Sequence, residues 1–315
     1  MKSVPTILLT LLTILFPACN GVTEDTPKDS GETGDTSVVL FAEPFEDTDW
    51  AARGWYDGPR FELEDGGRNA ASTKSCVWHW RKAGDVTPSG GGSRAHLTPV
   101  DRVTLSYWIK HDANWTWTGV AWHPHEFHFI TTEDAATVGP AWTHLTFYVE
   151  AVNGIPRVSI QDGRNIDPEN IDKDLVGVTE NRSVAGGNGD SDGYGDGDRY
   201  QSGGNWVNGK TWTADEAYFT DTPGPRWKGD WHHAEATFVL NTIKDGIGQK
   251  DGVIRFKFDG ETLMDYDDVV FRTGAHPDML INQFLMLPYF GPGVPHEQKI
   301  WVDDVTVTTT DPRAK

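Results

Sequence analysis

Several short stretches of the sequence carry aromatic and hydrogen-bonding side chains at alternate positions, where Ser or Thr would satisfy solubility. These side chains belong to Trp108, Lys110, Glu126, His128, Tyr148, Arg157 and Gln161. An indole or phenol ring stacks on the apolar face of a pyranose, and charged or amide groups hydrogen-bond its hydroxyls. The set therefore predicts a carbohydrate site on one face of a sheet. The alternative is that these are ordinary solvated strand faces, which can be divided between two sheets.

The elements that position these residues are predicted to be strands, because apolar and polar residues alternate around them. Leu105 and Ile109, for example, fall on the side opposite Trp108. The same alternation recurs in the ranges 103–110, 125–130, 145–150, 157–161, 233–240, 254–258 and 301–307. Gly, Pro and Asn separate these stretches, and no long amphipathic helix competes with them. This pattern predicts two stacked antiparallel sheets.

The segment Trp122–His128 also permits a metal interpretation, because it holds three histidines and one glutamate. Imidazole and carboxylate groups are zinc ligands. A strand with period two turns His125 away from Glu126 and His128, and the spacing is not the His-Glu-x-x-His pattern of helical zinc sites. Structural or sugar-contact roles for these histidines are therefore favoured over a transition-metal site.

The first nineteen residues have the organisation of an export signal. Lys2 supplies a positive start, and the range 4–16 is apolar but shorter than the roughly 20 residues of a membrane-spanning helix. The segment Leu15-Phe16-Pro17-Ala18-Cys19 resembles a bacterial lipobox, so we expect cleavage before Cys19 and lipidation of its thiol. The alternative is ordinary cleavage with an incidental cysteine. The expected location is the bacterial outer membrane or cell surface, or the medium, with membrane contact through the anchor only.

Composition changes after this signal. The range 20–37 is rich in Thr, Asp, Glu and Gly, which predicts a flexible acidic linker. The range 38–312 is aromatic-rich and strand-like without a second linker, which predicts one domain, expected to be a monomer. The chain has two cysteines, Cys19 and Cys76, so lipidation of the first excludes a disulfide.

The formal net charge of −20 argues against a nucleic-acid partner, because phosphate binding needs a basic surface. A polysaccharide is the expected partner. A polyanionic glycan requires that basic residues gather locally on this acidic chain.

A series of short motifs in the last third of the chain resembles a known family. In order, these are Trp231-His232-His233, Leu240-Asn241-Thr242, Asp251-Gly252-Val253-Ile254, Phe258-Asp259-Gly260-Glu261, the range 268–273 and Tyr289-Phe290-Gly291. The series is similar to the C-terminal half of concanavalin A-like jelly-roll polysaccharide lyases, the alginate- and glucuronan-cleaving kind. It implies an all-β fold, a two-sheet antiparallel jelly-roll sandwich, and β-elimination from a uronic-acid polymer.

β-Elimination needs three kinds of group. One neutralises the carboxylate at C6, a base removes the proton at C5, and an acid, typically tyrosine, protonates the leaving oxygen. Under this resemblance we assign His128 as the base and Tyr148 as the acid. Arg157 and Gln161 are assigned as the pair that binds the carboxylate.

The remaining candidates are assigned to substrate binding. They are Trp108, Lys110, Glu126 and Tyr289, of which Lys110 and Tyr289 are also substitutes for the catalytic roles. The Tyr-x-Tyr pair with a catalytic lysine and the Gln-x-His pattern of some of these lyases have no clear counterpart in the sequence. Nor does it contain the Glu-x-Asp-x-x-Glu series of retaining glycanases, so hydrolysis by paired carboxylates is disfavoured.

Calcium in a structural role is the one cofactor expected, and no organic cofactor is. In the range 188–198, oxygen-bearing side chains alternate with other residues and a glycine stands sixth, as at the front of an EF-hand loop. Position twelve is Arg199 rather than glutamate, and an acidic glycine-rich loop without metal is the alternative. The candidate ligands are Asp190, Asp192 and Asp196 and, by analogy with the terminal strands of jelly-roll carbohydrate proteins, Asp303 or Asp304 with Glu46 or Asp47.

Two functions of different classes remain open at the level of sequence. The first is a surface-tethered polysaccharide lyase. The second is a non-catalytic carbohydrate-binding lipoprotein on the same fold, with the aromatic residues and histidines as contacts. An envelope protein that binds protein partners is a third option, because fold alone does not decide function.

Overall fold

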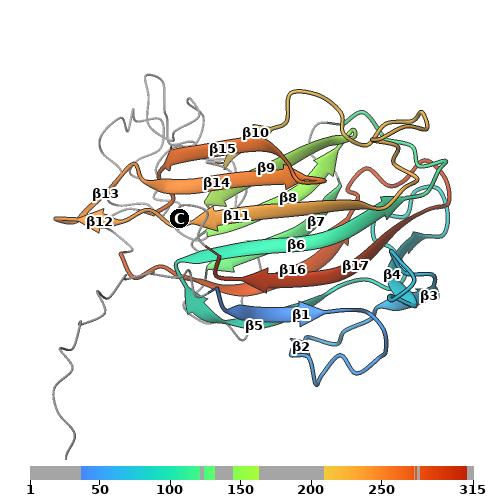
Figure 1. Ribbon diagram of the computed structural model, residues 1–315, viewed down its shortest axis with the longest axis horizontal. Helices are drawn as coiled ribbons and strands as arrows, with labels where there is room; N and C mark the ends of the chain where they lie inside the picture. Colours follow the sequence, from blue (N-terminus) through green and yellow to red (C-terminus); the bar gives the residue numbers. More distant parts are fainter. Residues whose placement is uncertain are drawn as a thin grey trace, which may run out of the picture. The chain divides into compact units, whose positions relative to one another are not determined.

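Strands account for all regular structure in the part of the chain that is described. The computed structural model describes residues 37–120, 124–131, 145–162, 209–272, 274 and 277–310. These residues form two large antiparallel sheets (Figure 1). Within these ranges, no helix is long and apolar enough to cross a membrane.

The two sheets draw their strands from distant parts of the sequence. The eight-stranded sheet has the order β15 (Glu261–Val269), β14 (Gly252–Phe258), β11 (His232–Val239), β6 (Arg102–His111), β17 (Gln298–Thr308), β4 (Lys74–Trp80) and β3 (Glu62–Asp65), with β1 (Val39–Glu43) also paired to β17. The seven-stranded sheet has the order β10 (Gly209–Thr213), β9 (Ile155–Asp162), β8 (Leu145–Val152), β7 (His125–Thr131), β16 (Ile281–Tyr289), β5 (Ser93–Val100) and β2 (Trp55–Tyr56). A small ribbon pairs β12 (Ile243–Lys244) with β13 (Ile247–Gly248).

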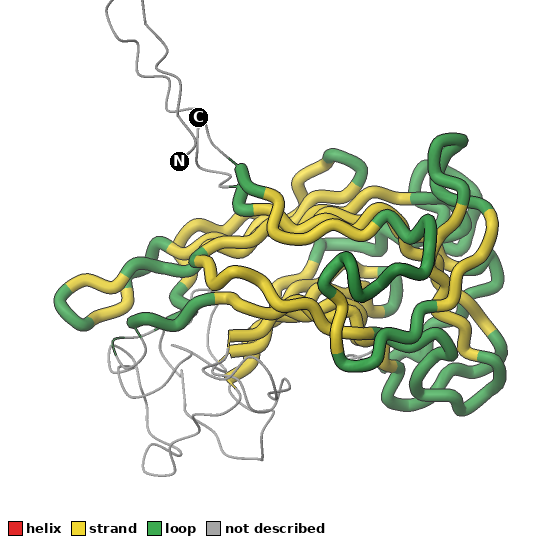
Figure 2. Tube along the Cα trace, turned by 90° about the horizontal axis from the view of Figure 1, so that it is seen from below, coloured by secondary structure: helices red, strands yellow, loops and turns green. Residues whose placement is uncertain are grey.

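The two sheets pack face to face around an aromatic core (Figure 2). Rings from opposite sheets meet across it, as in the pair Trp78 and Phe127, with centroids 5.5 Å apart, and the pair Phe147 and Phe238, 4.9 Å apart. Aromatic pairs at these separations contribute beyond the area that they bury. Cys76 lies in this core as a buried free thiol. Burial of apolar rings, rather than a disulfide at Cys76, therefore stabilises the sandwich.

The strands predicted from period-two patterning are confirmed. The predicted ranges fall within or overlap β6, β7, β8, β9, β11, β14 and β17. Strands that the alternation did not reveal include β5, β16 and the two-residue β2. β16 lacks a polar side because Asn282 and Gln283 are buried beside Phe284 and Leu285. A strand buried on both sides reads as a continuous apolar run and escapes a period-two search.

The motifs that carry the family resemblance hold turns and strand ends together. The side-chain oxygen of Asn241 accepts the backbone N–H groups of Phe271 and Arg272 at 2.8 and 2.9 Å. The Thr242 hydroxyl donates to Asp251 at 2.6 Å. Buried polar groups need such partners, so these residues specify the fold, which explains why the series indicates architecture more directly than chemistry.

Candidate active site

A continuous row of side chains crosses the outer face of the seven-stranded sheet, and we call it the central row. Its members, from β2 to β9, are Tyr56, Arg94, Leu285, His128, Tyr148 and Ser159, each directly opposite the next in the strand register. Directly opposed residues of antiparallel strands project on the same face. The intervening residues, such as Phe127 and Phe147, point into the core, so the central row faces outward.

The central row is largely buried although it faces away from the core. His128 is 5% exposed and Tyr148 is 4% exposed, and their rings meet edge to face with centroids 4.8 Å apart. Burial lowers the pKa of His128 to about 3, with a further contribution from the neighbouring His125. Burial, helped by the charge of Glu150, also raises the pKa of Tyr148 well above its usual value. At neutral pH, His128 is therefore a neutral imidazole and Tyr148 a protonated phenol.

A buried ion network flanks the central row. Glu150 on β8 accepts a hydrogen bond from Arg157 Nε at 2.8 Å and from Arg157 Nη2 at 2.5 Å, both on Oε1. Its other oxygen lies 2.6 Å from His125 Nδ1. Glu150 and Arg157 stand directly opposite each other on β8 and β9, so the register of the sheet itself forms this pair.

The placement of His125 corrects the sequence prediction that it points away from His128. The pairing of β7 with β16 shifts register between Met286 and Tyr289, where β16 advances three residues opposite two of β7, so the ladder is irregular at the start of β7. A β-bulge of this kind re-aims a side chain. The His125 ring consequently lies 4.9 Å from the Tyr148 ring and 6.0 Å from the His128 ring, on the outer face.

Tyr289 brings an exposed phenol to the same end of the site. It ends β16, is 41% exposed, and its ring is stacked with that of His125 at 6.4 Å. Among the residues described here, Tyr289 is thus the candidate contact that a polymer reaches from solvent.

Four residues of this face were not singled out from sequence. They are Tyr56, Arg94, His96 and Gln283. The Tyr56 ring stacks on that of His96 at 4.0 Å, and its hydroxyl donates to Gln283 Oε1 at 2.9 Å. Arg94 lies 3.1 Å from Asp57, Nε to Oδ2. The signal for Arg94 and His96 was their alternation with Ala95 and Leu97, in an eight-residue strand that directly follows three glycines.

Two predicted substrate contacts lie elsewhere. Trp108 and Lys110 belong to β6, which is in the eight-stranded sheet, so they do not join His128 and Tyr148. Lys110 Nζ sits 4.6 Å from the ring of Trp301 and 5.1 Å from that of Trp231. The prediction of one shared face was wrong for these two residues, because alternation shows that a side chain leaves the core but not from which sheet.

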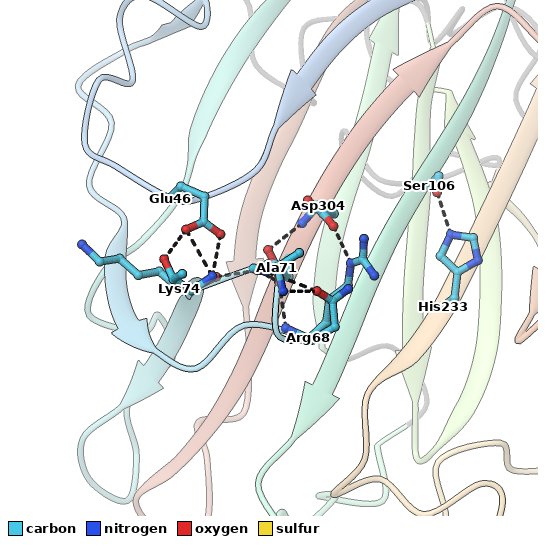
Figure 3. A network of polar contacts seen from close by, with 11 residues as sticks. Glu46, Arg68, Ala71, Lys74, Ser106, His233 and Asp304 are labelled. Atoms are coloured by element: carbon cyan, nitrogen blue, oxygen red, sulfur yellow. Dashed lines mark hydrogen bonds and ion pairs between the residues drawn. The ribbon is translucent and has the colours of Figure 1, made fainter.

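The outer face of the eight-stranded sheet is instead a set of partly exposed polar contacts. In Figure 3, Asp304 faces Arg68, with which it forms an ion pair, and His233 faces Ser106, 2.8 Å away. Glu46 accepts hydrogen bonds from Thr73. The predicted calcium ligand Asp304 therefore has a cation as partner. In the described ranges, no group of three or more His, Cys, Asp or Glu residues is placed to hold a metal ion.

Three further predictions concern the acidic loop, Gln161 and Glu126. Asp190, Asp192 and Asp196 lie outside the described residues, so the calcium loop stays a prediction. Gln161 is described by its backbone, which pairs with Thr146. Glu126 is buried, and burial together with the charge of Glu150 raises its pKa well above the usual value. Burial therefore favours the uncharged form of this carboxyl group, and Glu126 does not reach solvent as a substrate contact would.

Comparison with known proteins places the fold. No protein-family model and no curated protein sequence matches the chain. The endo-β-1,4-glucuronan lyase of the fungus Trichoderma reesei superposes with a TM-score of 0.50 at 13% identity, covering 87% of this chain and 96% of that one. An alginate lyase of Aplysia kurodai gives 0.49 at 11% identity, covering 88% and 99%. One from a Chlorella virus gives 0.48 at 15%, covering 87% and 100%. The two antiparallel sheets, together with the match to the glucuronan lyase at 0.50, show that the chain is an all-β jelly-roll sandwich, as predicted.

Proposed function

We propose that this protein is a polysaccharide lyase that cleaves a uronic-acid-containing glycan by β-elimination. The observation that carries the proposal is the central row, which brings a histidine, a tyrosine and an arginine to one face of a fold shared with a glucuronan lyase. These are the group types that the reaction requires: a proton acceptor, a proton donor and a cation for the carboxylate.

The protonation states suit the assigned roles. Tyr148 keeps its proton because burial raises its pKa, so it can donate to the leaving oxygen. Tyr289, exposed beside His125, is the substitute donor. Two histidines of β7, His128 and His125, are the candidates for removing the C5 proton.

The cation that neutralises the uronate is proposed to be Arg94 rather than Arg157. Arg157 already places two nitrogens on one oxygen of the buried Glu150, so its guanidinium is engaged. One partner of Arg94 is Asp57, whose side chain is 59% exposed, and Tyr56 is another. An exposed carboxylate exchanges readily for a substrate carboxylate, because exposed ion pairs contribute only about 0–1 kcal/mol.

The experiment that tests the proposal is an ultraviolet assay for the unsaturated product of β-elimination. Purified protein is mixed with a panel of uronate polymers, with calcium and with chelator in parallel. We expect absorbance to rise on one polymer and to fail to rise with Arg94→Ala. A flat trace on every polymer, with binding retained on a glycan array, would replace the lyase with a carbohydrate-binding protein.

Surface tethering is a separate proposal that rests on the N-terminal sequence. Cys19 lies outside the described residues, so the proposal of a lipid anchor is supported by the lipobox-like segment of the sequence. We expect radiolabelled palmitate to label the wild-type protein in a bacterial host and to leave Cys19→Ser unlabelled and released from the membrane fraction. Equal labelling of the wild type and Cys19→Ser would exclude Cys19 as the site of lipidation.

A further inference from the structure

One carboxylate on the outer face of the seven-stranded sheet binds an imidazole and a guanidinium at the same time. Glu150 Oε2 lies 2.6 Å from His125 Nδ1, and Glu150 Oε1 accepts Arg157 Nε at 2.8 Å. The side chain of Glu150 is 1% exposed, whereas that of His125 is 25% exposed. Arg157 balances the carboxylate charge on one oxygen, and the second oxygen is left to accept from the histidine.

This contact selects one nitrogen of His125 for chemistry. An imidazole that donates from Nδ1 to a carboxylate carries its lone pair on Nε2, so the tautomer that can accept a proton there is favoured. The carboxylate also stabilises the imidazolium that forms when the proton arrives, which is how an acidic residue supports a histidine base. Glu150 is thus a positioning residue rather than a reacting one.

The groups around His125 come from every neighbouring strand. β8 contributes Tyr148 and Glu150, and β9 contributes Arg157. Tyr289 of β16 stacks on the His125 ring at 6.4 Å, and His128, on β7 like His125 itself, lies 6.0 Å away. The His125 ring, which can accept a proton, therefore contacts the rings of two tyrosines, Tyr148 and Tyr289, which can donate one.

We propose that His125, held in place by Glu150, is the base that removes the C5 proton, and that His128 is a buried structural neighbour. This inference rests on the proposed lyase function. The C5–H bond breaks and its proton passes to His125 Nε2, while the electron pair forms the C4=C5 double bond. The C4–O bond breaks, and the leaving oxygen takes the proton of Tyr148. Transfer of a proton from the imidazolium to the phenolate restores both residues.

The alternative base, His128, is chemically weaker. Burial lowers its pKa to about 3, and a base is most effective when the pKa of its conjugate acid lies near the working pH. No ring nitrogen of His128 is bonded to a carboxylate in the described residues, so nothing there supports its protonated form. These features favour His125.

The deciding experiment compares His125→Gln and His128→Gln on the polymer that the wild type cleaves, with thermal unfolding checked for each. We expect kcat to fall by about 10²–10⁴ in His125→Gln, the contribution of a general base. His79→Gln is the matched control, because His79 forms a similar contact with Glu297, 2.7 Å from Nε2 to Oε1, on the eight-stranded sheet. It should leave kcat unchanged.

A second variant tests the role of Glu150 in a way that loss of folding does not imitate. Glu150→Gln removes the negative charge that favours the imidazolium, so the acid limb of the pH profile of kcat/KM should move to lower pH. Glu64→Gln is its control: Glu64 bonds Lys299 and, at 2.8 Å, the Trp301 indole on the other sheet. Its profile should superpose on that of the wild type.

Three results would overturn the assignment. They are near-wild-type kcat in His125→Gln, an unmoved acid limb in Glu150→Gln, and wild-type kcat/KM that stays flat down to about pH 4, as a base with the depressed pKa of His128 requires. If His125→Gln does not fold, the wild-type profile and Glu150→Gln still decide. If the wild type cleaves no polymer, the proposed lyase function itself fails, and not only the assignment of His125.

Discussion

The two outer faces of the sandwich carry the same kinds of residue under different conditions. On the seven-stranded sheet, Glu150 and Arg157 form a cross-strand pair with side-chain exposures of 1% and 11%. On the eight-stranded sheet, Asp265 and Arg255 form an equivalent pair with exposures of 48% and 24%. Both pairs stand directly opposite in register.

The difference teaches that burial, rather than composition, marks the candidate site. A buried charge is costly unless it is paired and hydrogen-bonded, whereas an exposed pair keeps most of its hydration. The pKa shifts follow the same division. That of His128 falls to about 3 and that of Tyr148 rises, each chiefly through burial. The polar residues around Lys110 and Trp301 lie on the outer face of the eight-stranded sheet, where side chains remain partly exposed.

The largest expected effect separates the two ion pairs. Arg157→Leu leaves Glu150 buried without its cation, so we expect the free energy of unfolding to fall by about 3–5 kcal/mol. Arg255→Leu should lower it by about 0.2–1 kcal/mol, as an exposed pair does. Chemical denaturation measures both. Equal losses in the two variants would show that burial does not distinguish the faces.

The next effect concerns catalysis on a cleaved polymer. Arg94→Ala should lower kcat/KM by about 10²–10³, comparable to removal of one group that stabilises developing charge. Lys110→Ala should change it by less than about twofold, because Lys110 lies on the other sheet and a distant charge is screened by salt. Steady-state kinetics on both variants test this. A larger loss for Lys110→Ala would return the substrate site to the eight-stranded sheet.

The third effect is on the pH dependence of stability. The folded pKa of His128, about 3, is below its ordinary value of 6.5, so only the unfolded chain binds a proton between these values. Stability from this group is therefore complete above pH 6.5 and is lost as pH falls toward 3. His128→Gln should flatten this slope. His233→Gln on the other sheet should flatten it less, because His233 is only half-buried and less desolvated.

Urea midpoints at pH 4 and pH 7 provide the measurement for both histidine variants. Comparing each protein with itself at the two pH values removes the direct cost of substitution. Identical slopes for wild type and His128→Gln would contradict the buried, neutral state of His128.

The smallest effect is expected on the solvated face. Lys110→Met keeps the apolar stem but removes the ammonium between Trp231 and Trp301. Loss of these partly exposed cation–π contacts should lower the free energy of unfolding by about 0.5–1 kcal/mol. Thermal unfolding at low salt measures this change. A loss as large as that of Arg157→Leu would show that this face also depends on desolvated charge.

Part of the site was predictable because strand alternation is a local property. His128 and Tyr148 alternate with core phenylalanines, so their outward direction followed from neighbouring residues alone. Arg94 was harder, because its strand begins directly after three glycines. His125 was predicted on the wrong side, because a bulge depends on how β16 pairs with β7 and leaves no local trace.

The sequence by itself determined that the chain is an all-β sandwich, since period-two alternation recurs and each strand must bury its apolar side. It also indicated which side chains leave the core. Only the tertiary structure decided which of them meet. Trp108 and Tyr148 obey the same local rule, yet they stand on different sheets because strand order joins distant segments. The contact between His125 and Glu150 likewise exists through pairing and desolvation, which are properties of the folded chain.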